Sequence, residues 1–183
     1  MRPHRIDHKL FTSDQIQGRI HQLIDEIANN SDTENLIMLG ILRGSFIFLA
    51  DLVRGFEQHK IHPRIDFITL SSYGAGTESS GSVTLTHDTT ENLTNADVVV
   101  VDDILDSGRT LAFARDLFLK RGARSVRTCV MLDKQTERAV EMNADYVGFP
   151  VEDVFVVGYG LDYDNRYREL PYIAEVTFVE PVA

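Results

Sequence analysis

Apolar residues along this chain follow two alternating patterns. From Ser13 to Asn29 they recur at helical spacing, which predicts an amphipathic helix with Ser13 as its N-cap. Elsewhere they form short continuous runs, and the four valines Val98–Val101 are typical of a strand covered on both faces. Strands are predicted at Leu36–Ile41, Ile65–Leu70, Val83–Thr86, Val98–Val101, Val126–Leu132, Phe155–Val157 and Ile173–Val179, and further helices at Phe46–His59, Thr110–Arg121 and Glu137–Met142.

The alternation of strands and helices predicts the fold class. It favours an α/β protein with a mostly parallel central sheet and helices on both faces. The length of 183 residues suits a single domain spanning the whole chain. In such sheets ligands bind beyond the carboxyl ends of the strands, so we expect the functional residues after Ile41, Leu70, Val101, Leu132 and Val157.

Charge, cysteine content and hydropathy restrict the expected partners of the protein and its expected cellular compartment. Lys and Arg number 18 against 28 Asp and Glu, and the formal charge of −10 disfavours a nucleic-acid partner. The single cysteine, Cys129, lies in an apolar run and is expected to be a buried structural thiol in a reducing compartment. The N-terminus is too polar for a secretory signal, and no apolar stretch approaches the length of a membrane span. We therefore expect a cytoplasmic protein with no membrane partner.

The run from Asp102 to Thr110 carries the strongest chemical signal. It follows the four valines, so it reads as a strand end, two adjacent acids, a short loop and a helix start. Unpaired backbone N–H groups and the helix dipole favour an anion over Asp106–Thr110, and Gly108 permits close approach. Asp102 and Asp103 suit a ribose diol, a magnesium ion, or both. The alternative is a solvated turn in which Asp103 or Asp106 merely caps the helix.

The sequence VVVVDDILDSGRTL resembles the phosphoribosyl diphosphate signature of the type I phosphoribosyltransferases. Four further segments match in the same order, and the resemblance, which covers about Leu36 to Tyr172, is closest to the hypoxanthine-guanine phosphoribosyltransferases. These segments are Gly40–Phe46, Ser71–Gly74, Leu132–Lys134 and Phe155–Tyr163. The resemblance implies the type I phosphoribosyltransferase fold, with a small hood built from the N-terminal and C-terminal segments and a flexible lid at 71–82.

The same resemblance implies an activity in purine salvage. A 5-phosphoribosyl group would pass from phosphoribosyl diphosphate to hypoxanthine, guanine or both, giving IMP or GMP and pyrophosphate. Mg²⁺ is the implied cofactor, and a homodimer or homotetramer the implied assembly. A regulatory protein that senses phosphoribosyl diphosphate on the same fold is the alternative. An unrelated nucleotide-binding enzyme is disfavoured, because the chain has neither a Walker A loop nor a GxGxxG fingerprint.

Residue roles follow from the matched positions. Asp106 is implied to be catalytic, as the proton acceptor near purine N7. The residues implied to bind phosphoribosyl diphosphate are Asp102, Asp103, Asp106, Ser107, Gly108, Arg109, Thr110, Leu42, Arg43, Gly44, Ser72, Tyr73 and Arg168. The residues implied to bind the purine are Lys134, Phe155, Val156 and Asp162, and those implied to hold the metal are Asp102, Asp103 and Asp162.

Simpler interpretations compete at three of these positions. Lys134 is either a surface lysine or the donor to the purine 6-oxo group, which would disfavour adenine because adenine also carries a donor there. Phe155 either packs in the core or stacks on the base. Arg166 lies two residues from Arg168 and competes with it for the diphosphate.

Two positions depart from the usual family pattern. Asp102 stands where the family usually has Glu, and Arg43 stands where it usually has Lys. The resemblance also implies that the Leu42–Arg43 peptide bond is cis. The sequence does not rank hypoxanthine, guanine and xanthine as substrates.

Overall fold

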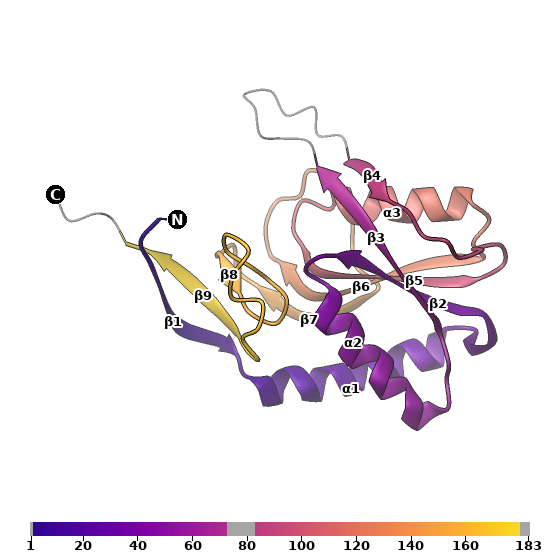
Figure 1. Ribbon diagram of the computed structural model, residues 1–183, viewed down its shortest axis with the longest axis horizontal. Coiled ribbons are helices and arrows are strands. Elements are labelled where there is room, and N and C mark those ends of the chain that lie inside the picture. Colours follow the sequence, from indigo (N-terminus) through magenta and orange to yellow (C-terminus); the bar gives the residue numbers. More distant parts are fainter. Residues whose placement is uncertain (1, 73–82, 180–183) are drawn as a thin grey trace.

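A six-stranded sheet forms the centre of the computed structural model, which describes residues 2–72 and 83–179 (Figure 1). Its strands lie in the order β4-β3-β2-β5-β6-β7, and all neighbours are parallel except β3 and β4. The bounds are β2 Leu36–Leu42, β3 Arg64–Ser72, β4 Val83–His87, β5 Asp97–Leu105, β6 Ser125–Lys134 and β7 Tyr146–Val151. The predicted mostly parallel α/β sheet is therefore confirmed.

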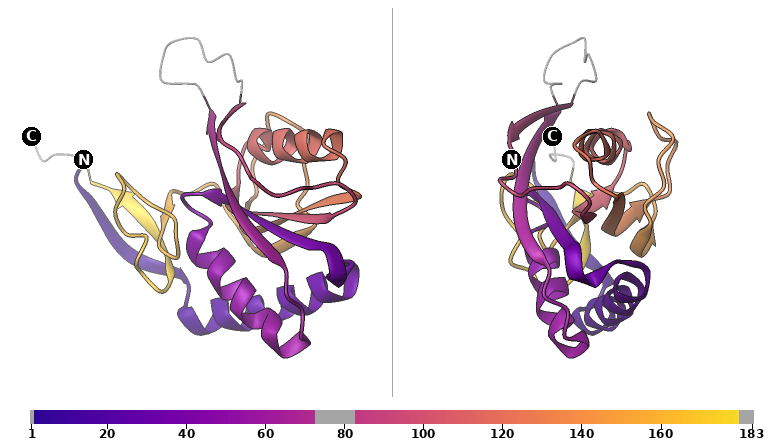
Figure 2. Two further views of the ribbon diagram at one scale, coloured as in Figure 1. Left: turned by 45° about the vertical axis from the view of Figure 1, so that its right-hand side comes forward. Right: turned by 90° about the vertical axis from the view of Figure 1, so that its right-hand side faces the viewer.

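Helices cover both faces of this sheet (Figure 2). Helices α1 (Ser13–Asn30) and α2 (Phe46–Gly55) pack on one face, and α3 (Arg109–Lys120) packs on the other. Val99 and Val101 of β5 point into the core beneath α1 and α2, while Val98 and Val100 point into the core beneath α3. This alternation explains why four consecutive positions of one strand must be apolar.

A second, smaller sheet lies to one side of the first. It contains β1 (His4–Phe11), β9 (Ile173–Phe178) and β8 (Val156–Val157) in that order, with antiparallel pairing throughout. The two ends of the chain thus meet in one sheet, which corresponds to the expected hood (Figure 1). Of the expected lid at 71–82, Ser71 and Ser72 end β3, and the rest lies outside the described residues.

Two local predictions were wrong. The N-cap of α1 is Thr12, not Ser13, because Thr12 and Gln15 form a reciprocal capping box. Residues Glu137–Met142 do not form a helix. Instead the Val140 N–H donates to the Ser107 carbonyl, and the Arg138 guanidinium bonds the Met142 carbonyl and the Asp133 carboxylate. These bonds hold the segment in an irregular conformation, and so short a helix would gain little from its own hydrogen bonds.

The other predicted elements agree with the structure to within a few residues, whereas β1 and β7 were not predicted. The predicted helix Phe46–His59 ends at Gly55 and continues as the 3₁₀ turn η2 (Phe56–His59), and a second turn, η1 (Thr33–Asn35), precedes β2. Cys129 is fully buried, as expected, and burial raises the pKa of its thiol. None of the helices in the described residues has the length and apolar character that a bilayer crossing needs.

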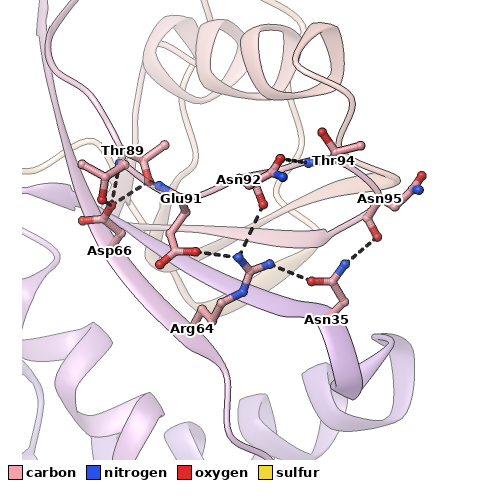
Figure 3. Close-up of polar contacts among 9 residues, drawn as sticks. Asn35, Arg64, Asp66, Thr89, Glu91, Asn92, Thr94 and Asn95 are labelled. Atoms are coloured by element: carbon pink, nitrogen blue, oxygen red, sulfur yellow. Dashed lines mark hydrogen bonds and ion pairs between the residues drawn. The ribbon is translucent and has the colours of Figure 1, made fainter.

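Polar contacts fasten the loop that leads into β5 (Figure 3). The Asp66 carboxylate on β3 accepts hydrogen bonds from the Thr89 hydroxyl and from the Thr90 N–H. Arg64 donates to Glu91 at 2.6 Å and to the Asn35 side chain at 2.7 Å (Figure 3). The loop is thereby tied to the starts of β2 and β3, which fixes where β5 begins.

Asp97, the first residue of β5, is the centre of a second network. Its buried carboxylate accepts from Arg124 Nε at 3.0 Å, from Ser125 Oγ at 2.7 Å and from the Asp32 N–H at 2.7 Å. Burial alone would raise the pKa of Asp97, but these hydrogen bonds outweigh it and lower the pKa to about 2. Asp97 is therefore charged, and its hydrogen bonds hold the start of β5, the strand that carries the signature motif.

Candidate active site

The signature motif lies at the carboxyl edge of the central sheet. Asp102 and Asp103 belong to β5, and the turn Asp106–Gly108 leads into α3. Gly108 is the N-cap of α3, with φ of 79° and no side-chain capping bond. The interpretation of Asp103 or Asp106 as a mere N-cap was therefore wrong. The positive φ, with Val140 and Met142 packed close by, makes glycine the suitable residue here.

A cavity of about 230 Å³ opens over this turn. Its lining combines the acid pair with the start of a helix, where backbone N–H groups have no intrahelical acceptors. The lining residues are Asp102, Asp103, Ile104, Leu105, Asp106, Ser107, Gly108, Thr110 and Leu111. Arg109, which the sequence also suggested, is half-buried and does not line this cavity. The arrangement can accept an anion at one end and hydroxyl groups or a cation at the other.

The two acids share a buried environment. Asp102 is 8% exposed, and its carboxylate accepts a hydrogen bond of 3.0 Å from the Asp103 N–H. Burial, followed by the neighbouring Asp103 charge, raises the pKa of Asp102 well above its ordinary value. Burial also raises the pKa of Asp103, while the positive charge of Arg168 acts in the opposite direction. A bound cation or hydroxyl donors would relieve this clustering of acidic groups.

The second predicted diphosphate loop touches the acid pair. The Leu42–Arg43 peptide bond is cis, as expected from the sequence, and Arg43 is exposed. A methyl group on Gly44 would overlap the Asp103 carboxylate. A methyl group on Gly160 would in turn overlap the Gly44 carbonyl. The loops after β2 and β8 therefore meet each other beside Asp103 near the end of β5, and the absence of side chains on the two glycines makes this contact possible.

A second cavity, of about 180 Å³, lies between the sheet edge and the hood. It shares Asp103, Ile104 and Asp106 with the first cavity. The other lining residues are Lys134, Val154, Phe155, Val156, Leu161 and Asp162. All four residues predicted to bind the purine thus line one cavity, directly beside the predicted phosphate turn.

Lys134 and Phe155 have environments that differ from their simpler interpretations. The Lys134 side chain is only 15% exposed, and its Nζ lies 2.9 Å from Asp153 and 3.8 Å from Asp106. Phe155 precedes β8 and is 43% exposed, so the core-packing interpretation was wrong. Its ring is held edge-on by Tyr163 and Phe178, with centroids 5.5 Å and 5.7 Å away. Two aromatic neighbours therefore hold the Phe155 ring in place, and the same ring lines the second cavity.

Asp162 and Arg168 form an ion pair of 2.6 Å, and Arg168 also donates to the Gly160 carbonyl. Arg166 is exposed and pairs with Tyr163 through the backbone. Because the Arg168 charge acts on Asp103, Arg168 is the better candidate for a diphosphate contact. Tyr73 lies outside the described residues, and for Ser72 the structure gives the backbone position at the end of β3.

Three contributing residues were not identified from the sequence. Asp153 is bonded to Lys134, Tyr163 braces Phe155, and Gly160 packs on the Gly44 loop. A signal was present for Asp153, because it follows β7 at the same sheet edge as the signature motif. β7 was not predicted, so the position of Asp153 at this edge was not foreseen.

The mostly parallel sheet, the turn after its fourth strand with the adjacent acid pair, and the hood beside the neighbouring cavity together have the form of a phosphoribosyltransferase. A family model described as "Phosphoribosyl transferase domain" matches residues 10–164, and the chain belongs to that family.

Individual relatives give a finer comparison. The chain is 39% identical over 168 residues to the hypoxanthine phosphoribosyltransferase of Escherichia coli, covering 91% of this chain and 93% of the relative. A crystal structure of a hypoxanthine-guanine phosphoribosyltransferase from Bacillus anthracis matches with a TM-score of 0.87 and 41% identity, covering 94% of this chain and 100% of that one. The chain is also 44% identical to the bifunctional protein TilS/HprT of Listeria monocytogenes, where the match covers 92% of this chain but 26% of the relative. The chain therefore spans about a quarter of the length of such bifunctional relatives. The regulatory alternative is not favoured by these similarities.

Proposed function

We propose that this chain transfers the 5-phosphoribosyl group from phosphoribosyl diphosphate to a 6-oxopurine, hypoxanthine or guanine, and releases pyrophosphate. One observation carries the proposal: the cavity over the signature turn and the cavity beneath the hood share Asp103 and Asp106. A 5′-phosphate on the turn and a purine under the hood would leave the ribose over the acid pair. A sugar phosphate joined to a base would therefore place its phosphate on the turn, its sugar over the acids and its base in the cavity beneath the hood.

The reaction breaks the bond between C1′ and a diphosphate oxygen and forms a bond between C1′ and purine N9. The turn Asp106–Thr110 would hold the 5′-phosphate by its N–H groups, and Asp103 would orient the ribose hydroxyls. Asp106 would accept the proton that the purine loses. An aspartate is a weak base at neutral pH, so its contribution would come from position rather than basicity. Phe155 would hold the base by stacking.

Base selectivity in this proposal comes from Lys134. An ammonium group offers three donors and no acceptor, so it pairs with the 6-oxo group of hypoxanthine or guanine and meets the 6-amino group of adenine donor to donor. The burial of Lys134 raises the penalty for that mismatch, because an unpaired donor in a closed site loses its water as well.

We propose Mg²⁺ as the cofactor, held by Asp102 and Asp103. Their carboxylate oxygens are the hard donors that Mg²⁺ prefers, and it commonly uses one or two carboxylates together with substrate phosphates. Among the residues that the structure describes, no group of three or more His, Cys, Asp or Glu side chains is placed to hold a metal. Asp162 would have to release Arg168 before it could join them. When bound, Mg²⁺ would neutralise charge on the leaving diphosphate.

We also propose a cytoplasmic homodimer or homotetramer. The buried free thiol of Cys129 supports a reducing compartment. In one similar protein of solved structure, the hypoxanthine phosphoribosyl transferase of Trypanosoma cruzi, the C-terminal region has a role in the oligomeric state. Sedimentation of the purified chain at micromolar concentration tests the assembly, and a single monomeric species would contradict it.

The activity is tested by mixing the protein with Mg²⁺, phosphoribosyl diphosphate and one purine at a time. We expect nucleotide and pyrophosphate with hypoxanthine, guanine or both, and at most traces with adenine. Donor binding without turnover of any purine would favour the sensing protein instead. No binding of the donor at all would refute both functions.

A further inference from the structure

Lys134 is held by two carboxylates from different parts of the chain. Its Nζ forms a hydrogen bond of 2.9 Å with Asp153 and lies 3.8 Å from Asp106. The Lys134 side chain is 15% exposed, whereas the side chains of Asp153 and Asp106 are 66% and 58% exposed. In both ion pairs Lys134 is therefore the more buried partner. Asp153 is the closer of its two acids.

The backbone fixes Asp153 in this position. Lys134 ends β6 opposite Val151 of β7, and the Gln135 N–H donates to the Val151 carbonyl at 2.8 Å. The Val154 N–H then donates to the Glu152 carbonyl at 2.7 Å, which closes a three-residue turn with Asp153 at its centre. Val154 lines the purine cavity immediately after that turn. Asp153 is therefore tied both to the strand that carries Lys134 and to the cavity wall.

The two carboxylates have opposing consequences for the proposed reaction. A bond to Asp153 keeps the ammonium beside the cavity with donors left for the purine. A bond to Asp106 would instead engage the group that is to accept the purine proton. Without Asp153, Asp106 would be the nearer acid, and the ammonium would shift toward it because opposite charges at this distance attract strongly. The ammonium would then lie against the proton-accepting carboxylate, away from the position in which it faces the purine oxygen.

We propose that Asp153 is a positioning residue that holds the Lys134 ammonium off Asp106 and presents it to the purine 6-oxo group. This inference rests on the function proposed above and deepens it. Asp153 acts through Lys134 and makes no contact with the reacting atoms. It thereby sets both the apparent affinity for the 6-oxopurine and the discrimination against adenine.

The test is a double-mutant cycle in steady-state kinetics. Asp153→Asn should raise the KM for hypoxanthine about tenfold and lower the ratio of kcat/KM for hypoxanthine over adenine by a similar factor. The KM for phosphoribosyl diphosphate should stay within about twofold of wild type. In a Lys134→Gln background, adding Asp153→Asn should change none of these values by more than about twofold, because coupled residues are not additive.

Glu152→Gln is the matched control. It removes the same charge from the adjacent exposed position, which lines a different cavity and makes no ion pair with Lys134 within the part of the chain that the structure describes. The control should behave as wild type. The inference is overturned if Asp153→Asn has no effect in active enzyme, if it acts equally with and without Lys134, or if Glu152→Gln reproduces it. A wild-type protein that makes no nucleotide from any purine would overturn the proposed function itself, which is a distinct result.

Discussion

Replacement of Asp97 by Asn should destabilise the fold in a way that depends on pH. The carboxylate is 8% exposed, and Arg124, Ser125 and the Asp32 N–H donate to it. Asparagine has nearly the same shape but carries no charge, so it resembles the protonated acid. The variant should therefore lose the stabilisation that comes from keeping this acid ionised in the folded state.

The magnitude follows from the pKa of Asp97, which is lowered from 3.8 to about 2. One pKa unit corresponds to about 1.4 kcal/mol, so ionisation of this group contributes about 2.5 kcal/mol at pH 7. Because the folded pKa is the lower one, the contribution is complete well above pH 4 and is lost as the pH falls through 2. At pH 3 about 1.3 kcal/mol should remain.

Urea unfolding of wild type and variant at pH 7 and at pH 3 measures this directly. The difference in unfolding free energy should be about 2.5 kcal/mol at pH 7 and about half of that at pH 3. Asp116→Asn, on the exposed side of α3, is the matched control and should cost less than about 0.5 kcal/mol at either pH. A difference between wild type and Asp97→Asn that is equal at the two pH values would refute the reasoning.

Three further substitutions test the site by steady-state kinetics. Asp106→Asn should lower kcat by about 10²- to 10⁴-fold while phosphoribosyl diphosphate still binds, since a general base contributes on that scale, and unimpaired turnover would remove its assigned role. Gly44→Ala should raise the KM for phosphoribosyl diphosphate, because the added methyl group overlaps the Asp103 carboxylate; an unchanged KM would mean that this loop does not bind the donor. Tyr163→Leu should raise the purine KM about two- to tenfold through loss of the edge contact that braces Phe155, and an equal rise in the donor KM would argue for general disorder instead.

The parts of the fold that the sequence predicted are those where burial alone decides the pattern. β2 and β5 are covered on both faces, so their apolar runs admit few other interpretations. The signature turn was also predicted from the sequence. Its Gly108 suits the positive φ of the turn, and the turn follows the strand that contains the four valines. Both features depend on neighbours in the chain more than on distant contacts.

The parts that were missed depend on distant contacts. β1 has no buried residue and gains its structure by pairing with β9 at the other end of the chain. β7 contains Gly148 and Pro150, which weaken a strand pattern and suit an edge position. Met142 belongs to a segment that has helical composition but forms no helix, and its neighbours Val140 and Arg138 bond to the signature turn and to β6. In each case tertiary pairing outweighed local preference.

The same reason explains which site residues escaped prediction. Lys134 and Phe155 were found from the resemblance, whereas their supports, Asp153 and Tyr163, are linked to them only through space. Asp153 could be placed only through β7, which was not predicted, and a tyrosine in a charged loop carries no local signal. Their importance depends on which side chains they touch.

The central claim is that the turn Asp106–Thr110 binds the 5′-phosphate of phosphoribosyl diphosphate while Asp102 and Asp103 face the ribose. A crystal structure with the donor, Mg²⁺ and an unreactive purine analogue tests it most directly. The account predicts the phosphate on the N–H groups at the start of α3, with the analogue between Phe155 and Lys134. A donor bound elsewhere, with that turn empty, would contradict it.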